Sequence, residues 1–491
     1  MTKPLTAPPG TSPVGNWIDG QWNFSGAVHE SVDPSTGEVV GAFRSAGAAE
    51  AETAIGAARK AFDTTDWSRA VTARAQALNE LADNLARRID DLASTVSRET
   101  GRLAWETMME AKMAVDLLRL NAARARVQIA GQAIEQAPGT YWHSVPEAAG
   151  VAGIISPWNG PLILSIRSIG PALAAGCTAV VKLPGQTALS NALLAAAVAE
   201  TASISPGVLS ILTEAGNEVA PRLVSSPEVD VLSYTGSTAV GRLVAAGAAP
   251  TVKRMILELG GKSPLVMFDD VDVDAIVPVA VRASTFMNGQ YCATGSRVLV
   301  HRAVADEFRV KLTAALQSVR VGPADDPASQ LGPLIDKAAV ERVDRLVEEA
   351  AGYAKVLVRG GIPEEPELRD GAYFRPALIE ADHVDVPIVQ QEVFGPVQTF
   401  EVFEDEADAI RRANATEFGL AAAVFTADDL RARRVGRELR VSTVWLNTFG
   451  MHTQQMAGTP VKQSGYGSLA GSAAVEAFQN TKRYGTAMPH A

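Results

Sequence analysis

The chain has 491 residues, of which 47% are hydrophobic and 20% charged, and its formal net charge at pH 7 is -11. This length exceeds what a single hydrophobic core usually serves, so we expect two or more domains. The chain is acidic and has no basic run, which argues against nucleic acid or an anionic membrane as the main partner. Its two cysteines offer no disulfide framework, and this favours a reducing, cytoplasmic compartment.

The first part of the chain predicts edge strands followed by helices. Residues 1–15 are rich in Pro, Thr and Gly and lack the apolar core of a signal peptide, so we expect a loose tail there. Short apolar pieces broken by turn dipeptides predict hairpin strands in 17–40. Apolar residues at three- and four-residue steps predict helices over 48–62, 72–100 and 105–129, with Gly101 ending the second. We find no apolar run long enough to cross a bilayer.

From residue 151 the pattern alternates between strands and helices. We predict strands over 151–155, 179–182, 209–212 and 229–234 and a helix over 186–202. Such alternation predicts a parallel, doubly wound sheet, with a dinucleotide at the carboxyl ends of its strands. Residues 234–241 contain only Gly236 and Gly241, so they lack the G-x-G-x-x-G pattern, and taken alone they fit a plain tight turn.

A second series of strand–helix units follows residue 261. It comprises predicted strands over 298–300 and 356–358 and predicted helices over 305–319 and 340–351. Polar, alternating residues mark 132–144 and 479–488. The histidines are scattered without ligand spacing, so no metal site is predicted; they are His29, His143, His301, His383, His452 and His490.

Cys292 is the candidate nucleophile. A thiolate is a strong nucleophile, and Gly289, Ala293 and Gly295 leave room beside it for a substrate carbon. On this segment alone a buried, inert cysteine would be the commoner outcome. The other cysteine, Cys177, is interpreted as a small structural residue.

Three distant segments change the interpretation of Cys292. They are Pro-Trp-Asn at 157–159, Leu-Glu-Leu-Gly-Gly-Lys-Ser-Pro at 257–264 and Gln-Glu-Val-Phe-Gly-Pro-Val at 391–397. Together with Cys292 they resemble the NAD(P)-dependent aldehyde dehydrogenase superfamily, in the family's order and spacing over nearly the whole chain. The resemblance implies an α/β fold with a Rossmann-like cofactor domain, an α/β catalytic domain and a small oligomerisation sheet.

The resemblance also implies domain boundaries and an assembly. We expect the cofactor domain in 1–130 and 149–260, the catalytic domain in 261–462, and the oligomerisation segment with the C-terminal tail in 131–148 and 463–491. The expected assembly is a homodimer or homotetramer, and the expected partner is a small-molecule aldehyde.

Family roles map onto three residues. Cys292 would attack the aldehyde carbon, and the Asn159 amide with a backbone N–H at Cys292 would stabilise the oxyanion. Hydride transfer to NAD or NADP would leave a thioester, which a water activated by Glu258 would hydrolyse. Without the resemblance, Glu258 could be a salt-bridged surface acid and Asn159 a turn former.

The family's cofactor positions also have counterparts here. They are Trp158, Lys182, Gly185, Gly236, Ser237, Glu392 and Phe394. Lys182 would bind the adenosine-side ribose, and Glu392 would hold the nicotinamide ribose beside Phe394. Many members carry a glutamate where this chain has Gly185. Its loss predicts added space and less repulsion of a 2′-phosphate, so we expect NADP to be tolerated with NAD still used.

Substrate preference depends on Arg167, Phe286 and Tyr291. Semialdehyde dehydrogenases of the family use an arginine at the Arg167 position to bind a substrate carboxylate, and benzaldehyde- and vanillin-type enzymes have a run similar to residues 162–168. The semialdehyde group usually adds a second arginine where this chain has Phe286. We therefore predict an aromatic or bulky apolar aldehyde. The alternatives are a semialdehyde, or an Arg167 that points away from the tunnel and pairs with an acid.

Two departures from the family pattern concern the wall of the site. Residues 457–460 read Ala-Gly-Thr-Pro in place of Pro-Phe-Gly-Gly, and Leu469 stands where an acid is frequent. Two rival functions have less support from the sequence. An acylating enzyme that passes the thioester to coenzyme A typically lacks the base at the Glu258 position. A non-catalytic binding or structural member would be favoured had Cys292, Glu258 or Asn159 been lost.

Overall fold

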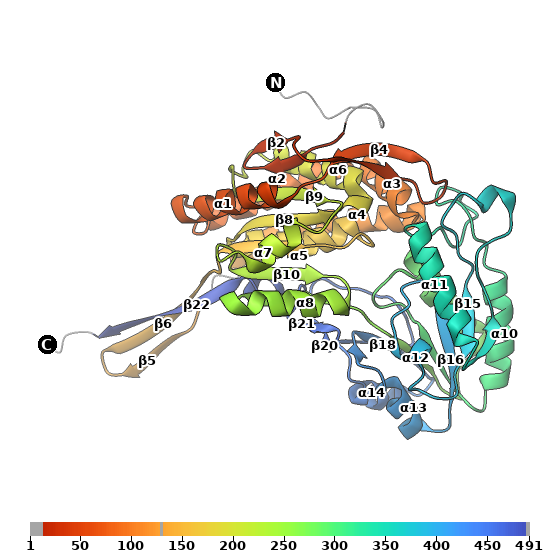
Figure 1. Ribbon diagram of the computed structural model, residues 1–491. Coiled ribbons are helices and arrows are strands. Elements are labelled where there is room, and N and C mark those ends of the chain that lie inside the picture. Colours follow the sequence, from red (N-terminus) through yellow and green to blue (C-terminus); the bar gives the residue numbers. More distant parts are fainter. Residues whose placement is uncertain (1–12, 128–130, 488–491) are drawn as a thin grey trace.

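The computed structural model describes residues 13–127 and 131–487, and it contains two α/β domains and a projecting three-stranded sheet (Figure 1). This architecture confirms the predicted fold class. Residues 1–12 of the expected tail, the last residues of the helix expected over 105–129, and residue 488 of the expected C-terminal strand lie outside the described residues. In the described ranges, no helix is long and apolar enough to span a membrane.

The first domain is built on an eight-stranded sheet. Its strands in spatial order are β2 (Gln21–Asn23), β1 (Asn16–Ile18), β9 (Leu209–Glu214), β8 (Thr178–Pro184), β7 (Val151–Ile155), β10 (Val231–Thr235), β11 (Arg254–Glu258) and β21 (Gly465–Tyr466). Strands β9 to β11 run parallel, and β1 and β21 flank them antiparallel. The strand order reverses between β7 and β10, which is where a doubly wound sheet opens a crevice for a ligand.

Helices cover both faces of this sheet. One face packs against α2 (Val71–Ala86), α4 (Ala104–Val127), α5 (Pro161–Ala175) and α6 (Ala188–Ala199). The other face packs against α1 (Ala48–Thr64), α7 (Val219–Ser225) and α8 (Thr238–Ala248). Both faces of β7 and β8 are therefore buried, which explains their continuous apolar sequences.

The helix expected over 72–100 is wrong as a single element, because the chain forms α2 and then α3 (Ile89–Thr100). The break lies at Arg87 and Arg88. The Arg88 guanidinium donates to the Asn84 carbonyl at 3.0 Å, and Arg87 donates to the Asn84 side chain. Gly101 ends α3 at φ 69°, as predicted. The helix expected over 186–202 begins as a 3₁₀ turn, η1 (Gly185–Thr187), and α6 ends at Ala199.

The second domain is built on a seven-stranded sheet. Its order is β14 (Lys355–Val358), β15 (Ala377–Glu380), β16 (Val397–Phe403), β13 (Arg297–His301), β12 (Pro264–Met267), β18 (Ala421–Phe425) and β19 (Thr443–Leu446). Side chains alternate between the faces: Leu265 and Met267 pack on the side of α9 (Val273–Thr285) and α10 (Ala305–Gln317), and Val266 on the side of α13 (Glu406–Ala413) and α14 (Asp429–Glu438). The helices α11 (Lys337–Ala350) and α12 (Pro387–Gln390) pack near β15.

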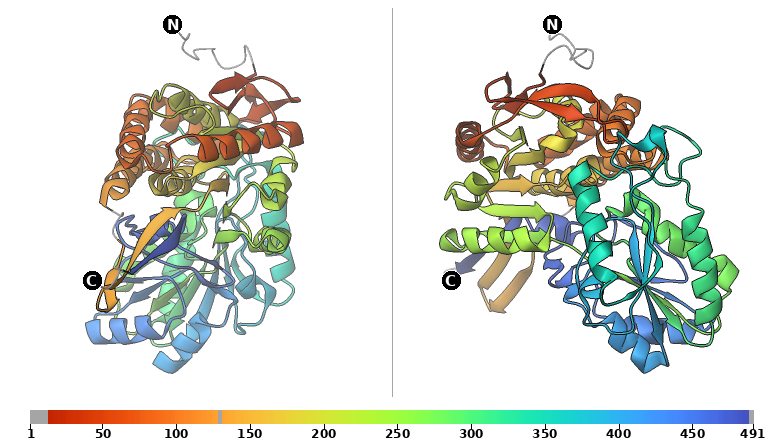
Figure 2. Two further views of the ribbon diagram at one scale, coloured as in Figure 1. Left: turned by 90° about the vertical axis from the view of Figure 1, so that its left-hand side faces the viewer. Right: turned by 45° about the vertical axis from the view of Figure 1, so that its right-hand side comes forward.

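A small sheet of β22 (Gln479–Ala487), β6 (Thr140–Ala148) and β5 (Ala133–Ala137) projects from the first domain (Figures 1 and 2). Gln479 pairs with Ala148 at its base, and Ala487 pairs with Thr140 near its tip. Because β21 pairs with β11, residues 465–466 of the C-terminal segment extend the eight-stranded sheet. The remaining elements are β3 (Val28–Val32), β4 (Val39–Arg44), β17 (Phe418–Gly419), β20 (Val461–Lys462), α15 (Ala473–Glu476), η2 (Ala249–Thr251), η3 (Phe286–Gly289) and η4 (Pro366–Leu368).

Candidate active site

The predicted site residues come from the two sheet edges that face each other between the domains. Asn159, Lys182, Ser237 and Glu258 lie at or just beyond the carboxyl ends of β7, β8, β10 and β11. Cys292 and Glu392 precede β13 and β16 of the second sheet. The carboxyl edge of one parallel sheet therefore meets the chain that enters the other sheet.

Gly260 and Gly261 let these segments approach Glu258 closely. A Cβ on Gly260 would lie 2.2 Å from Glu392 Oε2, and a Cβ on Gly261 would lie 2.3 Å from the carbonyl oxygen of Cys292. The backbone N–H of Gly261 donates to Glu392 Oε1 at 3.0 Å. A side chain at either glycine would push apart the chain segments that carry Cys292, Glu258 and Glu392.

The Cys292 loop, residues 286–292, is held in a strained conformation. Met287, Asn288 and Gly289 have φ values of 52°, 58° and 70°, and only glycine adopts this region without steric cost. Asn288 is buried, donating to the carbonyls of Gly101 at 2.9 Å and Pro333 at 2.8 Å and accepting from Gly332 N–H at 2.9 Å. These bonds hold the loop in place.

The side chain of Asn159 is joined to this loop. Its Nδ2 donates to the Gln290 carbonyl at 3.0 Å, and Gln290 Oε1 accepts from Ile335 N–H at 3.0 Å. An amide nitrogen carries two N–H donors, so Asn159 can also donate to a substrate oxygen. The structure thus joins the predicted oxyanion donor to a residue two positions before the predicted nucleophile.

Arg167 lies inside the site, where it pairs with the predicted base. Its Nη2 is 3.8 Å from Glu258 Oε2, and both side chains are largely buried. Burial raises the pKa of Glu258, and the Arg167 charge partly opposes that rise. One alternative was an Arg167 that points away from the tunnel and pairs with an acid. Arg167 does pair with an acid, but that acid is Glu258, a predicted residue of the site.

Burial and three nearby charges act on the pKa of the Cys292 thiol. Burial is the main cause that raises its pKa to about 12; the charge of Arg167 lowers this pKa, and the carboxylates of Glu392 and Glu258 raise it further. Arg167 is thus the charge at this site that favours the thiolate.

Two aromatic side chains of the Cys292 loop continue into a chain of ring contacts with three others, and we call the five together the aromatic wall: Trp105, Phe286, Tyr291, His452 and Trp445. Successive ring centroids lie 6.1, 5.5, 5.8 and 5.8 Å apart, and the Tyr291 hydroxyl is hydrogen-bonded to His452 Nε2. The sequence indicated Phe286 and Tyr291. It contains no signal for Trp105, Trp445 or His452, which are far in sequence from the Cys292 loop.

The nicotinamide-side candidates also converge. The rings of Trp158 and Phe394 meet edge to face at 5.6 Å, and Phe394 has a φ of 55°. Burial raises the pKa of Glu392 to about 7, with the nearby charges of Lys262 and Arg342 opposing the rise. Tyr291, Glu392 and Phe394 line one narrow cavity together.

The adenosine-side candidates include a partner that the sequence did not indicate. Lys182 Nζ lies 3.8 Å from Glu214 Oε2, and Glu214 Oε1 accepts from the N–H of Val219 at 2.7 Å at the start of α7. Gly236 precedes Ser237, the N-cap of α8, whose hydroxyl accepts from Val240 N–H at 3.4 Å.

The prediction that Gly185 leaves free space is wrong. Gly185 is buried, and a Cβ there would lie 2.8 Å from the Phe43 ring and 3.1 Å from Ala215 Cα. Phe43, from the N-terminal edge strand β4, occupies the space that a larger side chain would need, and this long-range contact has no local sequence signal.

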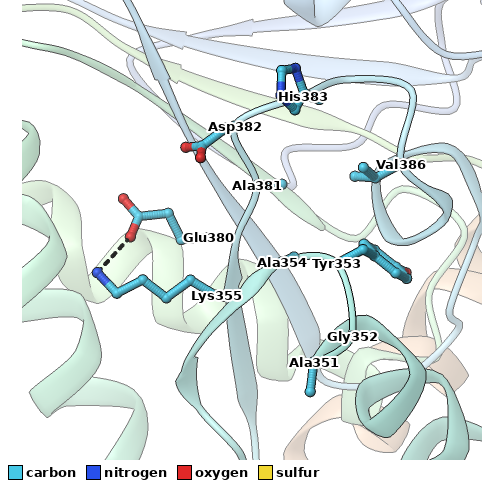
Figure 3. Close-up of a pocket in the computed structure, with 10 residues that line it drawn as sticks. All are labelled: Ala351, Gly352, Tyr353, Ala354, Lys355, Glu380, Ala381, Asp382, His383 and Val386. Atoms are coloured by element: carbon cyan, nitrogen blue, oxygen red, sulfur yellow. Dashed lines mark ion pairs between the residues drawn. The ribbon is translucent and has the colours of Figure 1, made fainter.

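A separate surface pocket of about 440 Å³ lies where β14 and β15 meet the end of α11 (Figure 3). Lys355 and Glu380 form an ion pair at 3.2 Å beside it. None of the predicted site residues lines this pocket. Across the described ranges, no group of three or more His, Cys, Asp or Glu side chains is arranged to hold a metal ion.

The doubly wound sheet and the loop that carries Cys292 belong to a two-domain α/β protein, with the candidate site between its domains. The model of the aldehyde dehydrogenase family matches residues 22–484, and the chain belongs to that family.

Named relatives cover nearly the whole chain. A chloroplastic betaine aldehyde dehydrogenase of Atriplex hortensis is 34% identical over 478 residues, covering 95% of each chain. A glutarate-semialdehyde dehydrogenase of Pseudomonas aeruginosa is 36% identical and covers 95% of this chain and 96% of its own length. A solved betaine aldehyde dehydrogenase of Staphylococcus aureus, in complex with NAD+, superposes with a TM-score of 0.94 at 33% identity and covers 96% of this chain and 95% of its own.

Proposed function

We propose that this protein oxidises an aldehyde to a carboxylic acid, with NAD(P)+ as the hydride acceptor, through a covalent intermediate on Cys292. The observation that carries the proposal is the convergence of Cys292, Asn159 and Glu258 between the two sheets. The direct test is the formation of reduced cofactor from a panel of aldehydes, before and after alkylation of the protein's thiols. No reduced cofactor with any aldehyde would contradict the proposal.

Each side chain has one chemical task. The Cys292 thiol loses its proton to solvent, and the thiolate Sγ bonds to the aldehyde carbon. The carbonyl oxygen becomes an oxyanion, which receives hydrogen bonds from the Asn159 amide and a backbone N–H. Bound NAD(P)+ supplies the acceptor for the hydride that leaves this carbon. Glu258 removes a proton from the water that hydrolyses the resulting thioester, and its burial makes it a stronger base than an exposed carboxylate.

The residues around the switch point fit a dinucleotide. The first turn of α8 presents backbone N–H groups beside the exposed Ser237, which suits a pyrophosphate. In this proposal Lys182 binds the adenosine-side ribose and Glu392 binds the nicotinamide ribose. The solved Staphylococcus aureus relative holds NAD+, and we propose NAD as the preferred cofactor of this chain.

Glu214 sets the cofactor preference in this proposal. Its carboxylate beside Lys182 reduces the positive charge that a 2′-phosphate would meet. Glu214→Gln keeps an oxygen for the start of α7 and removes the charge, so it should raise the ratio of kcat/KM for NADP to that for NAD by about 10-fold, or about 1.4 kcal/mol. Steady-state kinetics with both cofactors measures this ratio.

Glu218→Gln is the matched control. Glu218 lies four residues from Glu214 in the same turn, is exposed, and accepts from Ala48 N–H at 3.3 Å. This variant should leave the cofactor ratio unchanged. If Glu214→Gln changes the ratio no more than Glu218→Gln does, the charge argument fails. Gly185→Glu is a poor substitute, because a side chain there meets Phe43.

For the substrate we propose an aromatic or other bulky apolar aldehyde. The aromatic wall supports this class, since rings prefer edge-to-face and offset contacts with other rings. Arg167 is already paired with Glu258, and the position of a second arginine is occupied by Phe286. The alternative is a semialdehyde whose carboxylate binds Arg167. It is supported by the buried Nε of Arg167, which has no hydrogen-bond partner in the described part of the chain.

Arg167→Ala separates these substrate classes. If Arg167 acts by favouring the Cys292 thiolate, its loss should lower kcat/KM for a benzaldehyde-like aldehyde and for succinic semialdehyde alike, by roughly 5-fold, the equivalent of about 1 kcal/mol. Wild-type protein should prefer the benzaldehyde. Arg167→Lys, which keeps the charge, is the control and should lose less. A wild-type preference for the semialdehyde that Arg167→Ala removes would support the alternative.

We also propose a homo-oligomer in a reducing, cytoplasmic compartment. The projecting sheet exposes Ile134, Tyr141, Trp142 and Tyr484, which a second copy of the chain would cover. Both cysteines are free thiols, as a reducing compartment would keep them.

A further inference from the structure

Three charged side chains at and just before the start of α4 are almost completely buried and have no task in the chemistry above. Arg102, Glu106 and Glu110 are 3%, 1% and 3% exposed, and we call them the charged cluster. Arg102 forms an ion pair with Glu110, and its Nε lies 3.9 Å from Glu106 Oε2. A buried charge costs several kcal/mol unless it is paired and hydrogen-bonded. The hydrogen-bond partners of these three side chains therefore indicate what the cluster does.

Glu110 supplies the N-terminal cap of α5. The N-cap residue of this helix is Gly160, which has no side chain to accept hydrogen bonds, and Pro161 follows it. Glu110 Oε1 instead accepts from the N–H groups of Leu162 at 2.9 Å and Ile163 at 3.0 Å. A carboxylate at a helix N-terminus is favoured both by these donors and by the helix dipole. The cap thus comes from another helix, and it fixes the position of α5 against α4.

The same cluster fixes the backbone of Asn159. Arg102 Nη1, paired with Glu110, also donates to the carbonyl oxygen of Asn159 at 3.1 Å. Asn159 stands between the end of β7 and the start of α5, so its backbone is held by Arg102 and the helix that follows it by Glu110. Its side chain can then aim at the oxygen of the reacting carbon.

Glu106 holds the Cys292 loop from the same side. Its Oε1 accepts from Met287 N–H at 2.8 Å, and Met287 is the first of three successive left-handed residues. One helix therefore contacts both chain segments that must meet at the substrate, the one with Asn159 and the one with Cys292.

We propose that Glu110, acting through Arg102 and the start of α5, is a positioning residue that sets the Asn159 amide against the Cys292 loop for oxyanion stabilisation. Glu106 has the parallel task for the loop. This inference rests on the proposed function. An oxyanion donor contributes only when it is correctly placed, and a shift of about 1 Å in such a group can cost about 100-fold in rate.

A double-mutant cycle tests the proposal. The variants are Glu110→Gln, Asn159→Ala and their combination, and the measurement is the rate of the first burst of reduced cofactor at saturating aldehyde and NAD. The amide of Glu110→Gln would place an NH₂ group against either Arg102 or the α5 N–H groups, so this variant should slow the burst by about 10- to 100-fold. In the Asn159→Ala background the same change should slow it by less than about 3-fold, because residues that act as a unit are not additive. Equal slowing in both backgrounds would overturn the proposal.

Glu99→Gln is the matched control for folding effects. Glu99 is 1% exposed, lies in α3, and accepts from the N–H groups of Leu189 at 2.7 Å and Ser190 at 2.8 Å near the start of α6. It is therefore an equally buried acid that binds a helix N-terminus without contacting the Asn159 or Cys292 segments. Glu99→Gln should lower the Tm and leave the burst rate within about 2-fold. Slowing as large as that of Glu110→Gln would contradict a positioning role.

Glu106 provides a second, independent variant pair. Glu106→Ala removes the acceptor of Met287 N–H and should slow the burst. Glu106→Gln keeps an oxygen for that N–H and should restore most of the rate, which a general loss of stability would not produce. If Glu106→Gln is as slow as Glu106→Ala, Glu106 does not position the Cys292 loop as proposed. Failure of the proposed function itself has a different signature, since the wild type would then show no burst with any aldehyde, or Cys292→Ala would retain the burst.

Discussion

Cys292→Ala is expected to lower aldehyde oxidation by at least about 10⁴-fold, because a covalent route loses its nucleophile. Cofactor binding should remain nearly intact, since the predicted cofactor contacts come from other segments, chiefly those of Lys182, Ser237 and Glu392. Steady-state rates and the dissociation constant for NAD measure the two effects separately.

Cys177→Ala is the control for this result. Cys177 is fully buried, its Sγ donates to the Phe478 carbonyl at 3.3 Å, and burial raises its pKa to about 11. It lies among the apolar side chains that cover the first sheet. The variant should keep its rate at some cost in stability. Steady turnover by Cys292→Ala, or loss of activity in Cys177→Ala with an intact fold, would overturn the nucleophile assignment.

Motif order and strand periodicity predict much of the fold and the main groups of the site. The strand over 151–155 agrees with β7 at both ends, and Gly101 ends its helix as expected. Parallel strands place their carboxyl ends along one edge, so Asn159 and Glu258 could be expected close together from the sequence. Their roles in the reaction came from the resemblance, and the variants described for them test those roles.

Long-range packing accounts for what the sequence did not predict. In the sequence, Glu106 and Glu110 are two acids at four-residue spacing, which is typical of an ordinary helix face. The neighbouring residues give no sign that this face contacts Met287 and the start of α5. The break between α2 and α3 depends on how Asn84 is bound by two arginines. The space at Gly185 is filled from a segment about 140 residues away in the sequence. In each case the deciding partner is not evident from the local pattern.

Glu258→Gln is expected to separate the two halves of the reaction. Acylation of Cys292 does not need the base in this mechanism, so the variant should keep a burst of reduced cofactor. Hydrolysis of the thioester needs a proton acceptor for water, so the steady rate should fall by about 10²- to 10⁴-fold. Rapid-mixing and steady-state measurements on the same preparation give both numbers.

The pH profile gives an independent check on Glu258. The active form of the base is the carboxylate, and burial raises its pKa, so the steady rate should increase with pH through a midpoint above that of an exposed glutamate. Arg167 lowers this pKa, so Arg167→Ala should move the midpoint to still higher pH. In Glu258→Gln the residual steady rate should no longer show the rise with pH that Glu258 causes in the wild type. If Glu258→Gln loses the burst and the steady rate together, or if its pH profile matches that of the wild type, Glu258 is not the base that hydrolyses the thioester.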